Sequence, residues 1–249
     1  MSLLRVEGVS RSFGSVVAVK EVTMTVQPGE LRAVIGPNGA GKTTFFNMIS
    51  GFFPPTKGRI FFADHEITAM PSHRRVALGI ARTFQITEIF PELTVRENLR
   101  IAVEVASKHR LSLWLSRENE TRIEARVAAL IELGGLSAKA DRQVSELTHG
   151  AQRATEIMMA LALEPRLLLL DEPTAGMGDD ETYHIVRLVR RLHKDQKLAI
   201  VLVEHDMRVI FNLADRITVL AEGSALAEGT PDEIAKSEAV QAAYLGKVR

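Results

Sequence analysis

The segment GPNGAGKT, at residues 36–43, constrains the fold more than any other part of the sequence. It follows a short, largely apolar run at 31–35 that is typical of a buried strand, and it precedes apolar residues at helical spacing at 44–50. Glycines in such a loop let backbone N–H groups turn inward around phosphate oxygens, where a Cβ would obstruct the turn. The helix N-terminus adds the positive end of its dipole. This order of strand, glycine-rich loop and helix predicts a nucleoside triphosphate site.

The residues of this loop have distinct expected contacts with the nucleotide. Lys42 supplies a point charge for the β- and γ-phosphates, and the hydroxyl of Thr43 can ligate Mg²⁺. The alternative, a glycine turn with a solvated lysine, leaves the flanking strand and helix unexplained. The predicted phosphate-binding residues are Gly36, Pro37, Asn38, Gly39, Ala40, Gly41, Lys42, Thr43 and Thr44.

A second apolar run, at 167–170, ends in the carboxylates Asp171 and Glu172. A strand delivers the residues that follow it to the C-terminal edge of its sheet, where the phosphate-binding loop is also expected. We therefore expect Asp171 to hold Mg²⁺, directly or through water, and Glu172 to polarise the attacking water. A helix start that favours acidic side chains is the alternative explanation of these two residues.

Three further residues are candidates for contact with the nucleotide. His205 follows the next apolar run, at 198–203, and can reach the γ-phosphate from the same edge as a neutral hydrogen-bonding group. Gln85 lies where the core is expected to give way to helices, and Phe13 could stack on adenine. Their ordinary alternatives are a surface or core histidine, a polar surface residue and a core phenylalanine.

The rest of the chain predicts an α/β core interrupted by helices. Long amphipathic stretches dominate from about 86 to 159, whereas the runs at 167–170 and 198–203 are separated by a helix at about 181–195. Buried strands that alternate with helices imply a mostly parallel sheet. We expect a core lobe of about 1–85 and 161–249 and a helical lobe of about 86–160.

Shorter elements are expected at the two ends of the chain. Alternating residues at 3–7 and 22–26 predict strands near the N-terminus. A hairpin is expected at 217–227 around Glu222-Gly223, and a final helix at about 231–245.

Composition narrows the classes of function. The 31 basic and 31 acidic side chains cancel, which argues against a general binder of nucleic acid or anionic lipid, since such a surface needs a basic excess. The chain has no cysteine, so a disulfide framework and a thiolate metal site are excluded. The longest apolar run, at 157–163, is far shorter than the roughly 18–20 residues that span a bilayer. We expect a chain that does not cross a membrane by itself.

Together these motifs resemble the ATP-binding cassette, the nucleotide-binding subunit of ABC transporters, over essentially the whole chain. They fall in the order of that family: aromatic loop (Phe13), Walker A (36–43), Q-loop (Gln85), signature, Walker B with its glutamate (167–172) and switch histidine (His205). The resemblance implies a P-loop α/β core with an antiparallel N-terminal β part and an inserted helical lobe. It also implies ATP as the nucleotide, Thr43, Gln85 and Asp171 as Mg²⁺ ligands, and Glu172, His205 and Gln85 as catalytic residues.

The signature departs from the family pattern Leu-Ser-Gly-Gly-Gln. Here it reads Leu147-Thr148-His149-Gly150-Ala151, which keeps a hydroxyl at Thr148 and a close backbone approach at Gly150. In the family this segment opens a helix whose N-terminus faces the γ-phosphate bound to the other subunit. The resemblance therefore implies one ATP between two cassettes, served by Thr148 and Gly150 of the second. The loop after Walker B also departs, with Gly178 where an aspartate is usual.

Other stretches are similar to the branched-chain amino-acid uptake ATPases, namely 79–85, 93–99, 203–207, 227–231 and 243–246. The signature and the loop at 175–177 also resemble the related urea and short-chain amide ATPases. Such relatives imply import, with a second cassette (the same or a related chain), two permease subunits docked near Gln85 and 86–98, and a periplasmic solute-binding protein. They place the chain peripherally on the cytoplasmic face of the inner membrane.

Two other functions of P-loop proteins fit the sequence less well. A P-loop nucleotide kinase needs a lid with arginines and an acceptor site, and has no reason to carry the segment 147–150. An ABC ATPase of DNA repair or translation acts on nucleic acid without membrane partners, but such chains usually hold two cassettes or a long coiled-coil insertion. The single cassette and the zero net charge favour a transporter subunit without a nucleic-acid partner.

Overall fold

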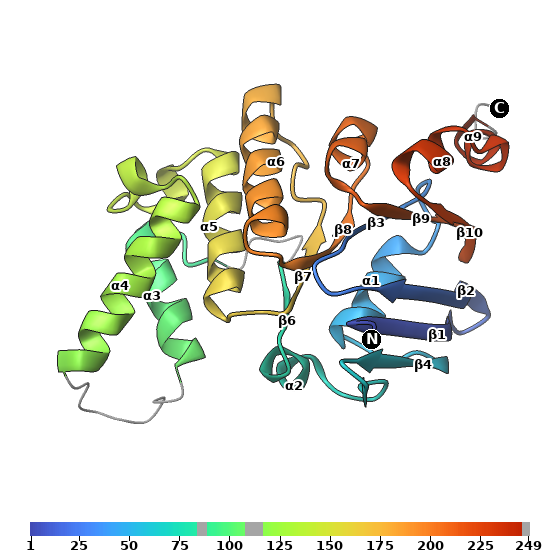
Figure 1. The fold of residues 1–249 in the computed structure, drawn as a ribbon, viewed down its shortest axis with the longest axis horizontal. Helices are drawn as coiled ribbons and strands as arrows, with labels where there is room; N and C mark the ends of the chain where they lie inside the picture. Colours follow the sequence, from blue (N-terminus) through green and yellow to red (C-terminus); the bar gives the residue numbers. More distant parts are fainter. Residues whose placement is uncertain (84–88, 108–116, 246–249) are drawn as a thin grey trace.

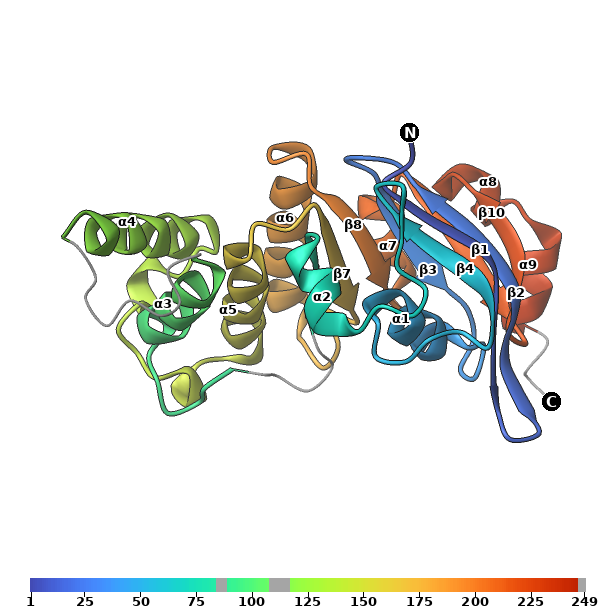
Figure 2. The same ribbon diagram turned by 90° about the horizontal axis from the view of Figure 1, so that it is seen from below.

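Helix α1 (Lys42–Ser50) lies between the two β-sheets found in the described part of the molecule (Figures 1 and 2). The structure is a computed structural model that describes residues 1–83, 89–107 and 117–245. Phe45, Phe46 and Ile49 of α1 are fully buried in a cluster to which both sheets contribute. The helix that follows the predicted phosphate-binding loop is therefore held on both sides.

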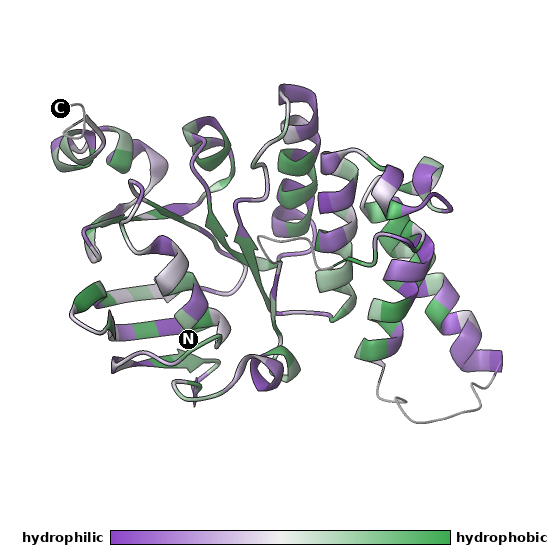
Figure 3. Ribbon diagram, turned by 180° about the vertical axis from the view of Figure 1, so that it is seen from behind, coloured by the Kyte–Doolittle hydropathy of each residue, from purple (hydrophilic) through white to green (hydrophobic). Residues whose placement is uncertain are grey.

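The larger sheet contains the three buried strands that the apolar runs at 31–35, 167–170 and 198–203 predicted. Within the described residues its order is β10-β9-β3-β8-β7-β6, and all neighbours except β10 and β9 run parallel. Every residue of β3, β7 and β8 is buried, and Figure 3 shows the central strands hydrophobic along their length. The strands are β3 (Leu31–Ile35), β6 (Ile80–Arg82), β7 (Leu167–Asp171), β8 (Ala199–Val203), β9 (Arg216–Ala221) and β10 (Ser224–Gly229).

The smaller sheet is antiparallel, as expected for the N-terminal β part, and its N-terminal strand extends further than predicted. Its order in the described chain is β2 (Val16–Val26), β1 (Leu4–Phe13), β4 (Lys57–Phe62) and β5 (His65–Glu66). The predicted strand at 3–7 stopped too early, because β1 continues through Gly8. This glycine has a φ of 53° and lies where the register between β1 and β2 shifts, so the chain forms a bulge there and stays paired.

The predicted helical lobe is present at one end of the molecule (Figure 1). It contains α3 (Val95–Ala106), α4 (Arg117–Leu133) and α5 (His149–Ala162). One buried cluster continues from these helices to β7 and to α6 (Asp179–Lys194), so α5 joins the lobe to the sheet. Among residues 1–83, 89–107 and 117–245, no helix is long and apolar enough to cross a membrane.

The predicted single helix at 231–245 is wrong. The chain forms α8 (Pro231–Ala235) and then α9 (Glu238–Leu245), after α7 (Met207–Leu213) earlier in the chain. Lys236 ends α8, and the hydroxyl of Ser237 accepts a hydrogen bond from the N–H of Val240 at 3.4 Å. Serine is a common residue at a helix start, and here it begins a second helix.

Arg75, in α2 (Ser72–Ala77), is a fully buried cation that joins α2 to the end of α1. Its guanidinium donates to the carbonyl oxygens of Met48 at 2.7 Å and Ile49 at 2.8 Å, in the last turn of α1. It also donates to the carbonyls of Met70 and Ile67, in the loop that precedes α2. Burial lowers the pKa of Arg75 to about 10, so the side chain stays charged at neutral pH and complements the helix C-terminus.

We expect Arg75→Met to reduce the free energy of unfolding by on the order of 3 kcal/mol, because several buried carbonyls lose their donor. Urea denaturation measures this loss. Arg74→Met, at the neighbouring exposed position, removes the same charge and is expected to change the unfolding free energy by less than about 0.5 kcal/mol. Equal losses in the two variants would mean that the buried contacts contribute nothing.

Candidate functional site

The loop between β3 and α1 forms one wall of an open cavity of about 620 Å³. Two of its glycines approach other strands too closely for a side chain. A Cβ on Gly36 would lie 2.1 Å from the carbonyl oxygen of Leu220, and one on Gly41 would lie 2.4 Å from that of Ala18. These glycines therefore allow the loop to pack between β2 and β9.

Lys42 lies inside the curve of the loop. Its Nζ donates hydrogen bonds to the carbonyl oxygens of Gly36 at 2.8 Å and Pro37 at 3.1 Å, and the residue is 6% exposed. The N-cap residue of α1 is Gly41, which has no side chain to cap the helix, and this suits the binding of phosphate by its first N–H groups. The other predicted loop residues that line the cavity are Asn38, Gly39, Ala40, Gly41, Thr43 and Thr44.

Asp171, the last residue of β7, is 1% exposed. Its Oδ2 accepts a hydrogen bond from Nη2 of Arg82 at 2.9 Å, whereas Oδ1 has no hydrogen-bond partner in the described chain. Burial raises the pKa of Asp171, and the Arg82 guanidinium opposes that rise. A buried carboxylate oxygen without a partner fits a ligand of Mg²⁺, for which Thr43 would supply a hydroxyl. Gln85, the third predicted ligand, lies outside the described residues.

Glu172 and His205 meet at the ends of β7 and β8, and both line the cavity of the loop. The Oε1 atom of Glu172 lies 2.7 Å from Nε2 of His205. Because a carboxylate can only accept, Nε2 of His205 carries the proton of this bond. Glu172 has a φ of 45°, which is uncommon for a residue with a side chain, and its N–H donates to the carbonyl of Val203 at 2.8 Å. The sharp turn after β7 places the Glu172 carboxylate in the cavity.

Two arginines that the sequence analysis did not assign hold the carboxylates in place. Arg82 donates to Oδ1 of Asn47 at 2.6 Å and to Oγ of Ser50 at 2.8 Å, as well as to Asp171, so it ties α1 to β7. Arg153 of α5 donates to the backbone carbonyls of Asp171 and Glu172. In the sequence, these two arginines differ from other charged residues only in that they stand near apolar residues of the core.

Glu204 is a third residue that the sequence analysis left without a role. It is 4% exposed, and its carboxylate accepts hydrogen bonds from the N–H and hydroxyl of Thr174 and from the N–H of His205. It therefore joins the loop after β7 to the loop after β8. A carboxylate at the end of an apolar strand, directly before the candidate histidine, was the available signal.

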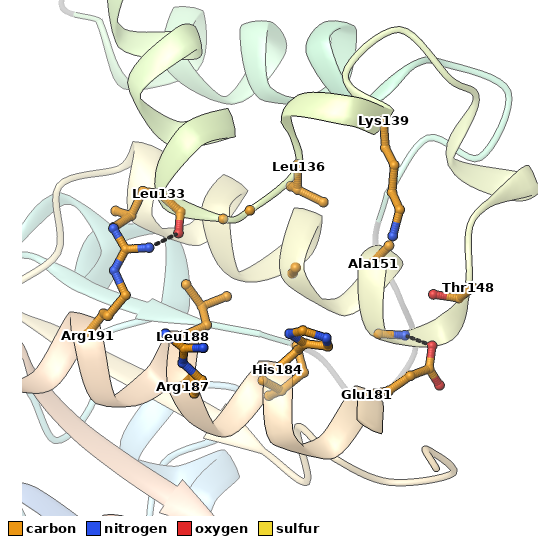
Figure 4. A pocket seen from close by; sticks show the side chains of 15 residues that line it. Leu133, Leu136, Lys139, Thr148, Ala151, Glu181, His184, Arg187, Leu188 and Arg191 are labelled. Carbon is orange, nitrogen blue, oxygen red and sulfur yellow. Dashed lines mark hydrogen bonds between the residues drawn. The ribbon is translucent and has the colours of Figure 1, made fainter. Parts of the chain in front are cut away.

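The remaining predicted site residues lie apart from the loop. Thr148 and Gly150, at the N-terminus of α5, line a second cavity of about 260 Å³, and none of its described lining residues belongs to the first (Figure 4). Phe13 ends β1 and packs edge to face on Phe53 with ring centroids 5.5 Å apart. The residues of β1 and β2 that line the phosphate-loop cavity in the described structure are Val16, Val17, Ala18 and Lys20. Phe13 is not among them, so its stacking on adenine stays a prediction.

The comparisons with known proteins agree with these motifs. Residues 19–175 match the family model of the ABC transporter, and the chain is 39% identical to the high-affinity branched-chain amino acid transport ATP-binding protein LivG of Escherichia coli (strain K12), over 98% of each chain. This chain belongs to the ABC transporter family. The cassette also matches the branched-chain amino acid ATP-binding cassette transporter model at 226–248 and is 36% identical to BraF of Pseudomonas aeruginosa, again over 98% of each chain. The resemblance seen in the motifs is confirmed.

Solved structures confirm the predicted fold class of this cassette. A nucleotide-free ATP-binding cassette from an ABC transporter superposes with a TM-score of 0.86 and 30% identity, covering 99% of this chain and 100% of the other. A cassette solved as a dimer in a post-hydrolysis state with ADP and Pi shares the fold at a TM-score of 0.78 and 24% identity, over 92% and 98% of the two chains. Family membership excludes the nucleotide kinase considered from the sequence.

Proposed function

We propose that this cassette hydrolyses Mg·ATP, with Glu172 as general base, to drive the uptake of branched-chain or other amino acids through a membrane ABC importer. The observation that supports this most is the meeting of Lys42, Thr43, Glu172 and His205 around one cavity. The four residues supply a phosphate-binding cation, a metal-binding hydroxyl, a base and a hydrogen-bond donor, which are the parts that phosphoryl transfer to water requires.

The chemistry follows from the groups around that cavity. Lys42 leaves the carbonyls of Gly36 and Pro37 for the β- and γ-phosphate oxygens, and the N-terminus of α1 binds the same anion. Mg²⁺, held by Thr43 and Asp171, would neutralise charge on the phosphates. Glu172 accepts a proton from the water whose oxygen attacks the γ-phosphorus, while the bond to the β-phosphate oxygen of ADP breaks. The Nε2–H group of His205 can turn from Glu172 to a γ-phosphate oxygen, which frees the base.

We propose that the complete site forms between two cassettes. Thr148 and Gly150 lie on a different cavity from Lys42 within one chain, and the N-terminus of α5 suits a γ-phosphate held by a second chain. ATP then favours the closed dimer and hydrolysis reopens it, a population shift between two states. The second cassette is a copy of this chain or a related one.

The transport role is proposed from the relatives and from the family. Two permease subunits would dock near Gln85 and 86–98 and convert closure into alternating access, with a periplasmic binding protein that delivers the solute. The cassette would lie peripherally on the cytoplasmic face of the inner membrane. A urea or short-chain amide importer is the second candidate, favoured by His149-Gly150 and by the loop at 175–177.

Reconstitution tests the transport role and separates the two solutes. Proteoliposomes that hold the cassette and its permease subunits are expected to take up radiolabelled leucine only when ATP and the binding protein are both present. Uptake of urea in place of leucine would support the second candidate. ATP hydrolysis without uptake of either solute would contradict the proposed coupling to amino-acid import.

Lys42→Ala is expected to weaken Mg·ATP binding at least tenfold, or about 1.4 kcal/mol, because a charge-assisted phosphate contact is lost. A calorimetric titration measures the change. Lys57→Ala removes the same charge from an exposed position in β4 and is expected to bind ATP as the wild type does. Unchanged affinity in Lys42→Ala would contradict the assignment of the phosphate-binding loop.

A further inference from the structure

The carboxylate of Glu181, in the first turn of α6, is held at the N-terminus of α5 (Figure 4). Its Oε1 accepts a hydrogen bond from the N–H of Gly150 at 3.0 Å. That N–H belongs to the first turn of α5, where backbone donors have no partner within the helix. Hydrogen bonds from the Thr148 hydroxyl and the Gly150 N–H hold the pKa of Glu181 below its usual value, so the group is an anion at neutral pH.

Thr148 and Gly150 are also the two residues proposed to receive the γ-phosphate of the second cassette. A carboxylate and a phosphate oxygen carry the same sign of charge and seek the same donors. The contact leaves little space, because even a Cβ on Gly150 would lie 3.0 Å from Cβ and 3.1 Å from Oε1 of Glu181. The carboxylate and the phosphate cannot bind the Gly150 N–H together.

The surroundings of Glu181 offer its carboxylate other partners. Lys139 extends from the loop above α5 toward the same cavity, and His184 lies one turn further along α6 (Figure 4). Lys139 is close enough for its positive charge to lower the pKa of Glu181 further. A lysine is therefore present near the Glu181 carboxylate when its hydrogen bond to Gly150 is broken.

We propose that Glu181 is an intramolecular substitute for the γ-phosphate, which occupies the signature in the separated cassette and has to leave it when a second cassette brings ATP. The proposal rests on the ATP sandwich described under the proposed function and adds a residue that sets how readily it closes. With Glu181 in place, closure replaces one charge-assisted hydrogen bond by another. ATP therefore stabilises the closed dimer less than it would if the helix N-terminus were empty. Glu181 thus limits closure of cassettes that have no further support from a permease.

The test compares dimer formation by chains that differ at one carboxylate. On a Glu172→Gln background, which blocks hydrolysis, sedimentation gives the dimer dissociation constant in saturating Mg·ATP. We expect Glu181→Gln to lower this constant by roughly fivefold or more, because a neutral amide accepts the Gly150 N–H less strongly, and Glu181→Ala to lower it at least as far. Asp180→Asn is the matched control, since it removes the same charge from the same exposed turn of α6.

The expected outcome has further internal controls. The affinity of each chain for ATP, measured below the concentration at which dimers form, is expected to stay unchanged because the phosphate-binding loop is intact. Thermal unfolding of the separated Glu181→Gln chain is expected at a temperature only slightly below that of Asp180→Asn, since the amide still accepts the hydrogen bond but without the charge. If the Ala variant unfolds, the Gln variant still decides the question.

Different failures point to different parts of the scheme. Equal dimer constants in Glu181→Gln and Asp180→Asn, or weaker dimers in the Glu181 variants, would overturn the role of Glu181 and leave the sandwich standing. Absence of ATP-dependent dimers in the parent Glu172→Gln chain would overturn the homodimeric sandwich, and this proposal with it.

Discussion

Glu172→Gln is expected to slow ATP hydrolysis by at least two orders of magnitude and to leave ATP binding unchanged. The amide has the shape of the carboxylate but cannot take a proton from water, and removal of a general base typically costs a factor of this size. Since the amide oxygen can still accept from Nε2 of His205, the geometry of the pair is kept. Because hydrolysis no longer reopens the closed state, the variant is expected to accumulate as an ATP-bound dimer.

Single-turnover release of phosphate measures the chemical step, and light scattering on a sizing column measures the dimer. Glu132→Gln, at an exposed position of α4, is the control and is expected to hydrolyse ATP at the wild-type rate. Turnover of Glu172→Gln within a few-fold of wild type would mean that another group is the base. Glu204 is a poor substitute, because it is 4% exposed and its carboxylate is already bonded to Thr174 and His205.

The sequence predicted the part of the site that lies at the ends of buried strands. Glu172 and His205 each follow a short apolar run, and the C-terminal ends of parallel strands meet at one edge of the sheet whatever the details of packing. The glycine loop was equally predictable, because its backbone demands glycine at Gly36 and Gly41. Local sequence and sheet topology were sufficient for these residues.

The supporting residues could not be predicted in the same way. Arg82 meets Asp171 across 89 residues of sequence, and Glu181 meets Gly150 across 31. Such contacts depend on how α1, α5 and α6 pack on the sheet, which periodicity does not specify. A charged residue also looks the same in a sequence whether it is solvated or buried, as Arg74 and Arg75 illustrate.

The errors in the secondary structure have physical causes as well. The predicted strand at 3–7 stopped before Gly8, but a glycine with positive φ can form a bulge inside a strand, and β1 continues beyond it. The break between α8 and α9 follows from the side chain of Ser237, which accepts a backbone hydrogen bond and starts a new helix. In both places a local contact overrode a pattern that was otherwise continuous.

Gly150→Asp is expected to abolish dimer formation and hydrolysis while the chain still binds ATP nearly as well as wild type. The new carboxylate would lie beside the γ-phosphate of the second cassette, where like charge and bulk both oppose closure. Within its own chain it also meets Glu181, whose Oε1 is 3.1 Å from the position of a Cβ on Gly150. Gly150→Ala adds bulk without charge and is expected to be less impaired, because it brings no like charge to the phosphate and its Cβ, 3.0 Å from Cβ of Glu181, requires only a small shift of α6.

Mixing two inactive variants tests whether the defect of Gly150→Asp lies in the contact between two chains. Each pair of a Gly150→Asp chain with a Lys42→Ala chain keeps one sound composite site, made of the phosphate-binding loop of the first and the signature of the second. With Lys42→Ala in excess, hydrolysis is expected to recover in part if this cassette pairs with itself. Recovery fails if the physiological partner is a different cassette, so the decisive measurement is the dilute Gly150→Asp chain alone. Full activity of that monomer would refute the sandwich, because hydrolysis would then need no signature from a second chain.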